Sequence, residues 1–142
     1  MNPTDTTHQS GHSDVVTHGV RVQAAALFLP DRSSPEQLRY VFAYRVQIAN
    51  GGDEPVTLRS RRWVITDADG AVEIVEGPGV VGEEPRLEPG QVHTYMSGCP
   101  LETCWGTMEG HFVMQRDDGS TFEAKIGRFF LAATVDPLPS QN

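Results

Sequence analysis

The chain has 142 residues, of which 38% are hydrophobic, enough for one domain with a single core. Its 11 basic and 19 acidic residues give a formal net charge of -8, which disfavours binding to nucleic acids or anionic membranes. No segment approaches the roughly 20 apolar residues that span a bilayer, and residues 1–14 lack the charged and apolar regions of a secretory signal. We therefore expect a cytoplasmic protein with no membrane-bound segment.

The two ends of the chain have compositions that do not support a core. Residues 1–13 are rich in Thr, Ser, His, Asn and Gly, and residues 136–142 contain Pro137 and Pro139. Such segments bury too little apolar surface to offset the entropic cost of ordering them. The sequence therefore predicts a disordered tail at 1–13, one domain at 14–135 and a flexible tail at 136–142.

Alternation of apolar and polar residues dominates the first half of the domain. It runs from Val16 to Phe28, where Pro30 ends it, and again from Leu38 to Ile48. A period of two predicts two strands, each with one buried face, that pair with one another. The side chains expected to face the core from the second strand are those of Tyr40, Phe42, Tyr44, Val46 and Ile48.

The remaining apolar segments are short and separated by turns. Turn residues occur at 50–53, 67–70 and 117–119, and the apolar phase changes near Ser60 to Arg62 and again at Gly127. Each phase change predicts a β-bulge or a similar irregularity. About seven to nine short strands, with no helix to connect parallel ones, predict an all-β antiparallel sandwich.

Residues 77–82 have the GxGxxG spacing of dinucleotide-binding proteins. In those proteins a helix N-terminus follows the glycines and binds the pyrophosphate, whereas Glu83, Glu84 and Pro85 follow here. Two interpretations remain open: a turn whose glycines adopt positive φ, or a nest of N–H groups that binds a phosphate or carboxylate. The flanking acidic residues favour the turn. The candidate surface for a ligand or a partner comprises Gly77, Gly79, Gly82, Arg61, Arg62 and Trp63.

Several separated motifs resemble the ApaG family in order and spacing. They are Tyr40-Val41-Phe42-Ala43-Tyr44 with Asn50, Arg61-Arg62-Trp63 with Thr66-Asp67, the GxGxxG segment, Leu87-Glu88-Pro89-Gly90, Tyr95-Met96-Ser97-Gly98, Gly106-Thr107-Met108-Glu109-Gly110, and Phe122 through Phe129. The resemblance covers nearly the whole chain. The sequence departs from the family at Arg62, where histidine is common, and at Gly127, where proline is common.

The resemblance implies an immunoglobulin-like sandwich of the fibronectin type III kind. Bacterial members of the ApaG family are named for a link to cobalt and magnesium resistance and efflux, and similar domains occur in an F-box protein and in a mitochondrial protein that interacts with a polymerase. This implies a non-enzymatic module that binds a protein partner in a pathway of divalent-cation tolerance. The alternative is a small-ligand binder that holds a nucleotide or pyrophosphate at the GxGxxG loop.

Other reactive residues do not form the pattern of a metal or catalytic site. The five histidines are His8 and His12 in the N-terminal tail, and His18, His93 and His111 on separate predicted strands. Cys99 and Cys104 lack the second pair that tetrahedral zinc would need, so we expect free thiols. Ser97 is not preceded by a nucleophile-elbow pattern. We expect no catalytic residue, no bound metal and no cofactor.

Overall fold

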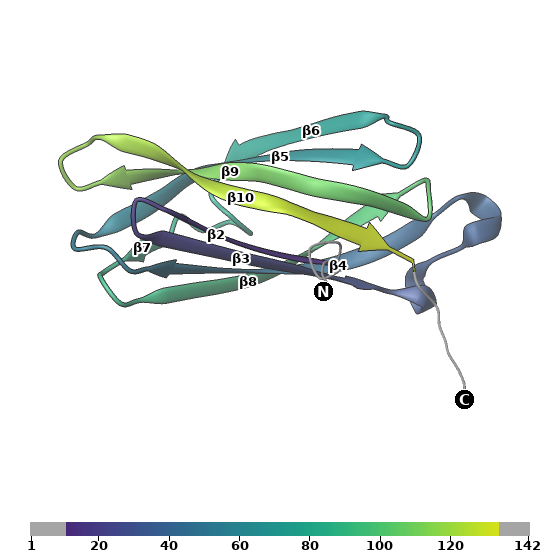
Figure 1. Cartoon of the computed structure of the whole chain (residues 1–142), viewed down its shortest axis with the longest axis horizontal. Helices are drawn as coiled ribbons and strands as arrows, with labels where there is room; N and C mark the ends of the chain where they lie inside the picture. Colours follow the sequence, from purple (N-terminus) through teal and green to yellow (C-terminus); the bar gives the residue numbers. More distant parts are fainter. Residues whose placement is uncertain (1–10, 134–142) are drawn as a thin grey trace, which may run out of the picture.

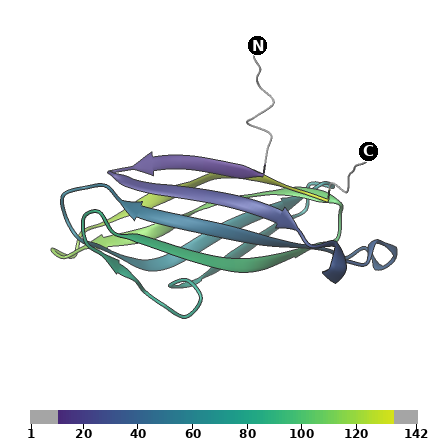
Figure 2. The same ribbon diagram turned by 90° about the horizontal axis from the view of Figure 1, so that it is seen from below.

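The computed structural model describes residues 11–133, which form a sandwich of two antiparallel β-sheets (Figure 1). The four-stranded sheet has the order β2–β3–β4–β8. Its strands are β2 (His12–Thr17), β3 (Val20–Phe28), β4 (Tyr40–Asn50) and β8 (Val92–Leu101). Figure 2 shows these strands side by side, with the other sheet behind them.

The second sheet has the order β10–β9–β5–β6, and the short β7 also pairs with β5. Its strands are β5 (Val56–Asp67), β6 (Val72–Pro78), β7 (Arg86–Leu87), β9 (Trp105–Arg116) and β10 (Thr121–Ala132). Two short 3-10 turns, η2 (Pro30–Arg32) and η3 (Pro35–Gln37), lie between β3 and β4. The nine strands within residues 11–133 confirm the predicted antiparallel sandwich. Within residues 11–133, no helix has the length and apolar character needed to cross a membrane.

Aromatic rings fill the centre of the space between the sheets. The Trp63 ring of β5 lies 5.1 Å from that of Tyr44, 6.4 Å from that of Phe112 and 6.0 Å from that of Phe129. The ring planes meet at 64° to 85°, the edge-to-face arrangement that aromatic quadrupoles favour. Trp63 therefore packs against residues from both sheets and from three other strands.

The alternation predicted for β4 is confirmed. Phe42, Val46 and Ile48 are fully buried, and Tyr44 is 8% exposed. Arg45, between them in the chain, is exposed. A strand places successive side chains on opposite faces, so this pattern fixes which face of β4 forms the core.

The predicted beginning of that strand at Leu38 is wrong. Leu38 is 61% exposed, and its φ of 55° lies in the left-handed region. Leu38 directly follows η3, and its N–H donates a hydrogen bond to the carbonyl of Pro35, the first residue of η3. The chain is therefore still turning at Leu38. β4 begins only at Tyr40 because Pro35 initiates a 3-10 turn that the apolar pattern does not reveal.

The first predicted strand is a hairpin of β2 and β3. His18 and Gly19 have φ values of 47° and 82°, and Thr17 pairs with Val20. This is the geometry of a two-residue type I′ turn. Directly paired residues of two strands have their side chains on the same face of the sheet. The inward-facing residues are therefore odd-numbered in β2 and even-numbered in β3, which is why Val16 is 61% exposed.

β2 begins at His12, ahead of the domain boundary expected at residue 14. His12 and Ser13 pair with Ala25 and Ala24 of β3. The assignment of His12 to a disordered tail is therefore wrong. His8, the other residues of 1–10 and those of 134–142 lie outside the described residues.

Both predicted phase changes occur, as shifts in the pairing with β9. In β5 the shift lies between Leu58 and Ser60, so the extra residue is Arg59, slightly before the predicted position. In β10 it lies between Ile126 and Phe129 and includes Gly127, as predicted. Because of this extra residue, the buried side chains change from even positions such as Leu58 to odd positions such as Trp63.

The sandwich is closed along one side and open along the other. β10 packs against β2 and β3 and so closes the first side. On the opposite side β6 and β8 are the last strands of their sheets, and neither pairs with a further strand within residues 11–133. The candidate site lies between these two edges.

Truncating Phe42 to Ala should lower the free energy of unfolding by about 3 to 5 kcal/mol, because the side chain is fully buried. Leu27→Ala on the neighbouring strand is the control, since Leu27 is 64% exposed and should cost less than about 0.5 kcal/mol. Urea denaturation of the two variants measures both values. A loss below about 1 kcal/mol for Phe42→Ala would contradict the assigned core face.

Candidate functional site

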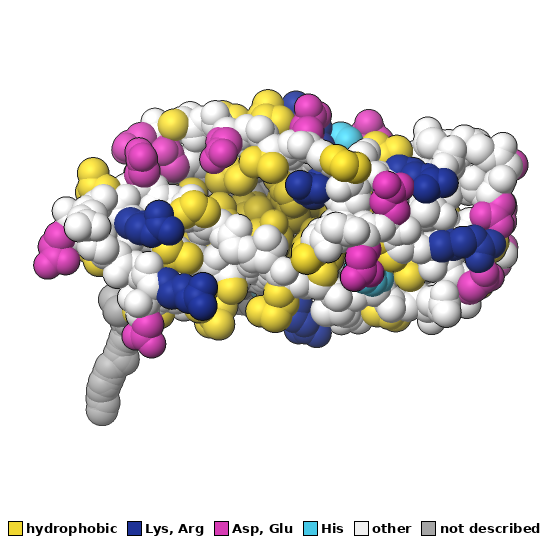
Figure 3. Space-filling view, turned by 180° about the vertical axis from the view of Figure 1, so that it is seen from behind, with side chains coloured by type: hydrophobic (Ala, Val, Ile, Leu, Met, Phe, Trp, Pro, Cys, Tyr) yellow, Lys and Arg dark blue, Asp and Glu magenta, His cyan; other side chains and the backbone are white. Residues whose placement is uncertain are grey.

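A hollow of about 230 Å³ opens between β6 and β8, and Figure 3 shows its hydrophobic floor from the open side of the sandwich. We call this hollow the trough. Its lining residues are Tyr44, Arg61, Trp63, Ile65, Glu73, Val75, Ser97, Gly98, Cys99, Pro100 and Met108.

The floor of the trough is apolar and comes from both sheets. Trp63 and Met108 are each 1% exposed and Cys99 is 3% exposed. Ile65 and Val75, both half-buried, form the wall beside them. These side chains meet here because every second residue of β5, β6, β8 and β9 points between the sheets. A concave, mostly apolar surface with a few polar groups is typical of a binding site.

Two buried polar groups lie beside this floor and interact with each other: the indole N–H of Trp63 and the hydroxyl of Tyr95. Burial raises the pKa of Tyr95, and the nearby Trp63 indole opposes that shift in part.

The rim of the trough carries one charge of each sign. Nη1 of Arg61 donates hydrogen bonds to the carbonyls of Pro78 at 2.9 Å and Gly79 at 3.0 Å. The guanidinium lies against Gly77, where a Cβ would come within 3.0 Å of Nη2. Glu73 of β6 is exposed and forms no ion pair within residues 11–133. The positive charge is thus held in place, and the negative charge is available to a partner.

The trough continues into a second hollow of about 500 Å³ beside η3. The two hollows share Ile65, Glu73 and Pro100. Asp67 and Glu102 also line the second hollow, and Arg39 is the one basic residue in its lining. Negative charge therefore exceeds positive charge along this part of the surface.

The GxGxxG segment includes the last two residues of β6, Gly77 and Pro78, and then forms a tight turn. Val81 and Gly82 have φ values of 49° and 78°. The amides of Val80 and Glu83 donate to each other's carbonyls at 2.8 and 3.0 Å, and the amide of Gly79 bonds back to β5 at 2.8 Å. Because these N–H groups are paired within the chain, they do not converge on a position where a phosphate could bind.

The predicted surface residues fall in different places. Three lie together at one end of the trough: Arg61, Gly77 and Gly79. Trp63 lies in the floor, and Gly82 lies in the exposed turn. Arg62 faces away from the other sheet, where its Nε lies 3.0 Å from Oε2 of Glu76. The arginine pair predicted as one surface is therefore divided between the two faces of β5.

Several residues of the trough were not selected from the sequence. These are Tyr44, Ile65, Glu73, Val75 and Met108 as binding residues, together with the rim residue Ser97. Alternation places Tyr44 on an inward face, but in β6 it would turn Val72 and Ile74 inward, whereas the structure turns Glu73 and Val75 toward the trough. Alternation also does not reveal that β6 and β8 end their sheets, and that feature is what opens the hollow.

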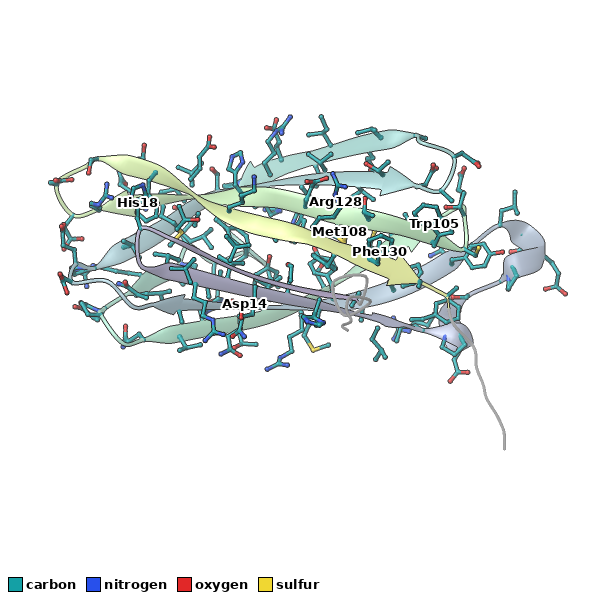
Figure 4. The ribbon with its side chains drawn as sticks, in the orientation of Figure 1. Asp14, His18, Trp105, Met108, Arg128 and Phe130 are labelled. Carbon is teal, nitrogen blue, oxygen red and sulfur yellow. The ribbon has the colours of Figure 1, made fainter. Side chains whose placement is uncertain are left out.

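The four histidines within residues 11–133 do not line the trough. The His18 ring packs edge-on against Phe122 at 5.2 Å (His18 is labelled in Figure 4), and Nε2 of His111 lies 3.6 Å from a carboxylate oxygen of Glu123. Among residues 11–133, no three His, Cys, Asp or Glu side chains are grouped so that they could hold a metal ion.

Cys99 and Cys104 are both free, as predicted. Cys99 lies in the trough, where burial raises the pKa of its thiol to about 11 and the nearby charge of Glu73 adds to the shift. Cys104 is exposed. Cys99 is therefore protonated near neutral pH and is a poor nucleophile.

A second exposed apolar feature lies on the outer face of β9 and β10. The Trp105 ring, on a residue that is 43% exposed, stacks on Phe130 with 6.1 Å between ring centres (Figure 4). This stacked pair lies outside the trough and does not line its extension.

The sequence profile of the ApaG domain matches residues 30–116 of this chain. A Brucella anthropi protein named ApaG is 54% identical over 116 residues, which are 82% of this chain and 89% of the relative. An ApaG protein of Aromatoleum aromaticum is 48% identical over 120 residues, 84% of this chain and 94% of the relative. A crystal structure of a Bordetella pertussis protein described as ApaA is 41% identical and superposes with a TM-score of 0.78, covering 87% of this chain and 95% of that one.

Replacing Gly79 by Ala should lower the free energy of unfolding by about 2 to 4 kcal/mol. Its φ of 59° is unfavourable for other residues, and a Cβ would lie 2.2 Å from the Glu83 carbonyl oxygen. Gly82→Ala is the matched control: its φ is 78°, but a Cβ would meet nothing within 4 Å. This control should lose only about 1 kcal/mol. Equal losses in chemical denaturation would refute the role given to the close contact at Gly79.

The two thiols should react at very different rates with Ellman's reagent at pH 8. A thiol with a pKa near 11 is about 0.1% ionised at that pH, so the thiolate that reacts is scarce at Cys99. The Cys104→Ser protein should react about 100 times more slowly than the parent and recover ordinary reactivity in denaturant. A Cys104→Ser protein that reacted as fast as the parent would show that Cys99 is accessible and ionised.

Proposed function

The chain belongs to the ApaG domain family, and we propose that it is a non-enzymatic module that binds another protein through the trough. The observation that carries this proposal is the apolar hollow between two strand edges that pair with nothing further within residues 11–133. Unpaired edges and concave apolar surfaces are the features through which sandwich domains bind extended segments of other proteins.

The chemistry of the side chains in the trough supports binding more than catalysis. The thiol of Cys99 is protonated near neutral pH, for the reason given above. Ser97 lies beside Tyr44, whose pKa burial raises and the Ser97 hydroxyl partly lowers. A phenol of this kind is protonated near neutral pH and cannot act as the general base that a serine nucleophile requires.

The link to cobalt and magnesium tolerance rests on the ApaG family rather than on a metal site in this chain. In this proposal the protein affects divalent cations through its partner, so the trough and not a cluster of ligands carries the function. The alternative function, a nucleotide or pyrophosphate held at the GxGxxG loop, has less support. The amides of Gly79, Val80 and Glu83 are already paired, and Arg61 is bonded to the carbonyls of Pro78 and Gly79.

A pair of tryptophan substitutions in β8 tests the proposal. Ser97→Trp should fill the trough, whereas Met96→Trp adds the same side chain at the adjacent position, which is 59% exposed on the outer face. In a source strain that lacks the gene, we expect Met96→Trp to restore growth in cobalt as the parent does and Ser97→Trp to fail. Matching melting temperatures ensure that both proteins are folded. Full restoration by Ser97→Trp would contradict the proposal.

Photo-crosslinking identifies the contact directly. A benzoylphenylalanine at position 97 should crosslink to a discrete protein in cells, and the same group at position 96 should not. Calorimetric titration with ATP, NAD and pyrophosphate, with and without magnesium, addresses the alternative. We expect no heat of binding up to about 1 mM ligand, which corresponds to roughly 4 kcal/mol of binding free energy. Micromolar nucleotide affinity would favour the alternative function instead.

A further inference from the structure

The free edge of β6 presents a row of unpaired backbone groups. The amide of Asp67 bonds to the carbonyl of Ala71 at 2.9 Å, and the amide of Gly79 bonds to that of Arg59 at 2.8 Å. In an antiparallel pair of strands every second residue exchanges hydrogen bonds with its partner. Counting along the β5–β6 register from these two bonds, the bonded residues of β6 are Glu73, Val75 and Gly77. The intervening residues therefore direct their backbone groups away from β5; they are Val72, Ile74 and Glu76.

The edge of β8 across the trough is interrupted by a proline. The amide of Asn50 bonds to the carbonyl of Gln91 at 3.0 Å, and the register then places Tyr95, Ser97 and Cys99 in the bonds with β4. At the trough the free edge of β8 is made by Gly98 and Pro100. Proline has no N–H, so the free edge of β8 is interrupted at the trough. β6 presents the amides of Val72, Ile74 and Glu76 with no proline among them and is the better edge for an added strand.

The side chains of β6 fit an apolar strand beside it. Val72 and Ile74 are exposed apolar residues on the outer face, at 58% and 50%. Val75 points into the trough. Edge strands are usually protected by charged side chains, by Pro or by a covering element, and β6 carries the inward-facing Glu73, Glu76 and a terminal Pro78. A strand added to β6 must therefore neutralise Glu73. An added strand would cover these residues and close the open side of the sandwich.

Glu73 sets the charge that such a strand must carry. It points inward at the edge of the trough and has no ionic partner within residues 11–133. Covering it with an apolar residue would remove water from an unpaired carboxylate, which is costly, whereas Lys or Arg would neutralise it. Asp67 and Glu102 add further negative charge along the same hollow.

We propose that β6 accepts an extended peptide as an additional antiparallel strand, with an apolar residue over the trough and Lys or Arg two positions away beside Glu73. This inference rests on the proposed function and identifies the partner as a protein with an exposed basic and apolar segment. A second copy of this chain fits less well, because each copy would bring the Glu73 and Glu76 carboxylates and a net charge of -8 to the same edge.

A short synthetic peptide serves as the probe. Acetyl-Thr-Val-Ile-Lys-Val-amide, aligned antiparallel to β6, places its first Val opposite Val75, its Ile opposite Ile74 and its Lys opposite Glu73. In an NMR titration of the full chain we expect saturable shifts below about 1 mM peptide. The same titration should slow hydrogen exchange at the amides of Val72, Ile74 and Glu76.

Backbone methylation tests whether the peptide binds as a strand. N-methylation of its Ile, whose amide should face β6, is expected to weaken binding at least tenfold. N-methylation of its Lys, whose amide should face away from β6, is expected to change the affinity less than threefold. Equal effects of the two methyl groups would overturn the strand geometry.

A charge exchange tests the role of Glu73. Glu73→Lys should weaken the parent peptide at least tenfold and should bind more tightly a peptide with Glu in place of Lys. Glu83→Lys is the matched control: it makes the same change of charge in the exposed turn, outside the trough, and should alter the affinity less than twofold. A Glu73→Lys protein with unchanged affinity for both peptides would overturn the proposed selection for a basic residue.

The remaining outcomes also decide the question. Protection of the β8 amides instead of the β6 amides, no binding at 1 mM, or a dimer that pairs through β6 in solution would each overturn the inference. If the peptide fails while the crosslink at position 97 persists, only the strand addition is refuted and the proposed function stands. If the crosslink also fails, the proposed function is refuted with it.

Discussion

The packing of Trp63 is the interaction on which both the core and the trough depend. Its ring contacts Tyr44 in the opposite sheet and Phe112 and Phe129 in its own sheet. Sheets of a sandwich pack about 10 Å apart, and a large ring between them maintains that separation near the open edges. The same ring then lies in the floor of the trough. A smaller residue here would remove both a central core contact and the apolar base of the hollow.

The glycine motif stabilises this arrangement from the end of β6. After Pro78 the chain leaves the sheet, turns at Val81 and Gly82, and returns as β7 beside β5. Val80 is 1% exposed and belongs to the core, so the excursion is anchored in the protein. The carbonyl of Gly79 accepts a hydrogen bond from Arg61 and thereby fixes that side chain at the rim. In this account the glycines act by shaping the backbone.

Local patterns predicted the fold well wherever one face of a strand is buried. The alternation in β4 identified Phe42, Val46 and Ile48 as core residues, and loss of phase indicated both irregularities. The hairpin between β2 and β3 was missed because its turn, His18-Gly19, lacks the usual Asn-Gly or Asp-Gly sequence. Val16 and Val20, on either side of the turn, keep the period of two that is typical of one continuous strand.

The site was harder to predict than the fold, for a topological reason. A sequence pattern shows that Glu73 and Val75 share a face, but strand order alone decides whether that face meets another strand or opens to a hollow. Arg61 and Arg62 are adjacent in the chain, and the strand geometry places them on opposite faces. The recognisable motif contains the glycines at positions 77, 79 and 82, whereas the residues that line the trough lie outside it.

Hydrogen–deuterium exchange on the complex with the crosslinked partner tests the central claim that the trough is the contact surface. Peptides covering β6 and β8 should exchange more slowly in the complex than in the free chain, while those covering the stacked Trp105 and Phe130 should be unchanged. Protection confined to the turn at residues 79–83, with β6 and β8 unaffected, would contradict the claim and indicate that the glycine motif is the contact surface.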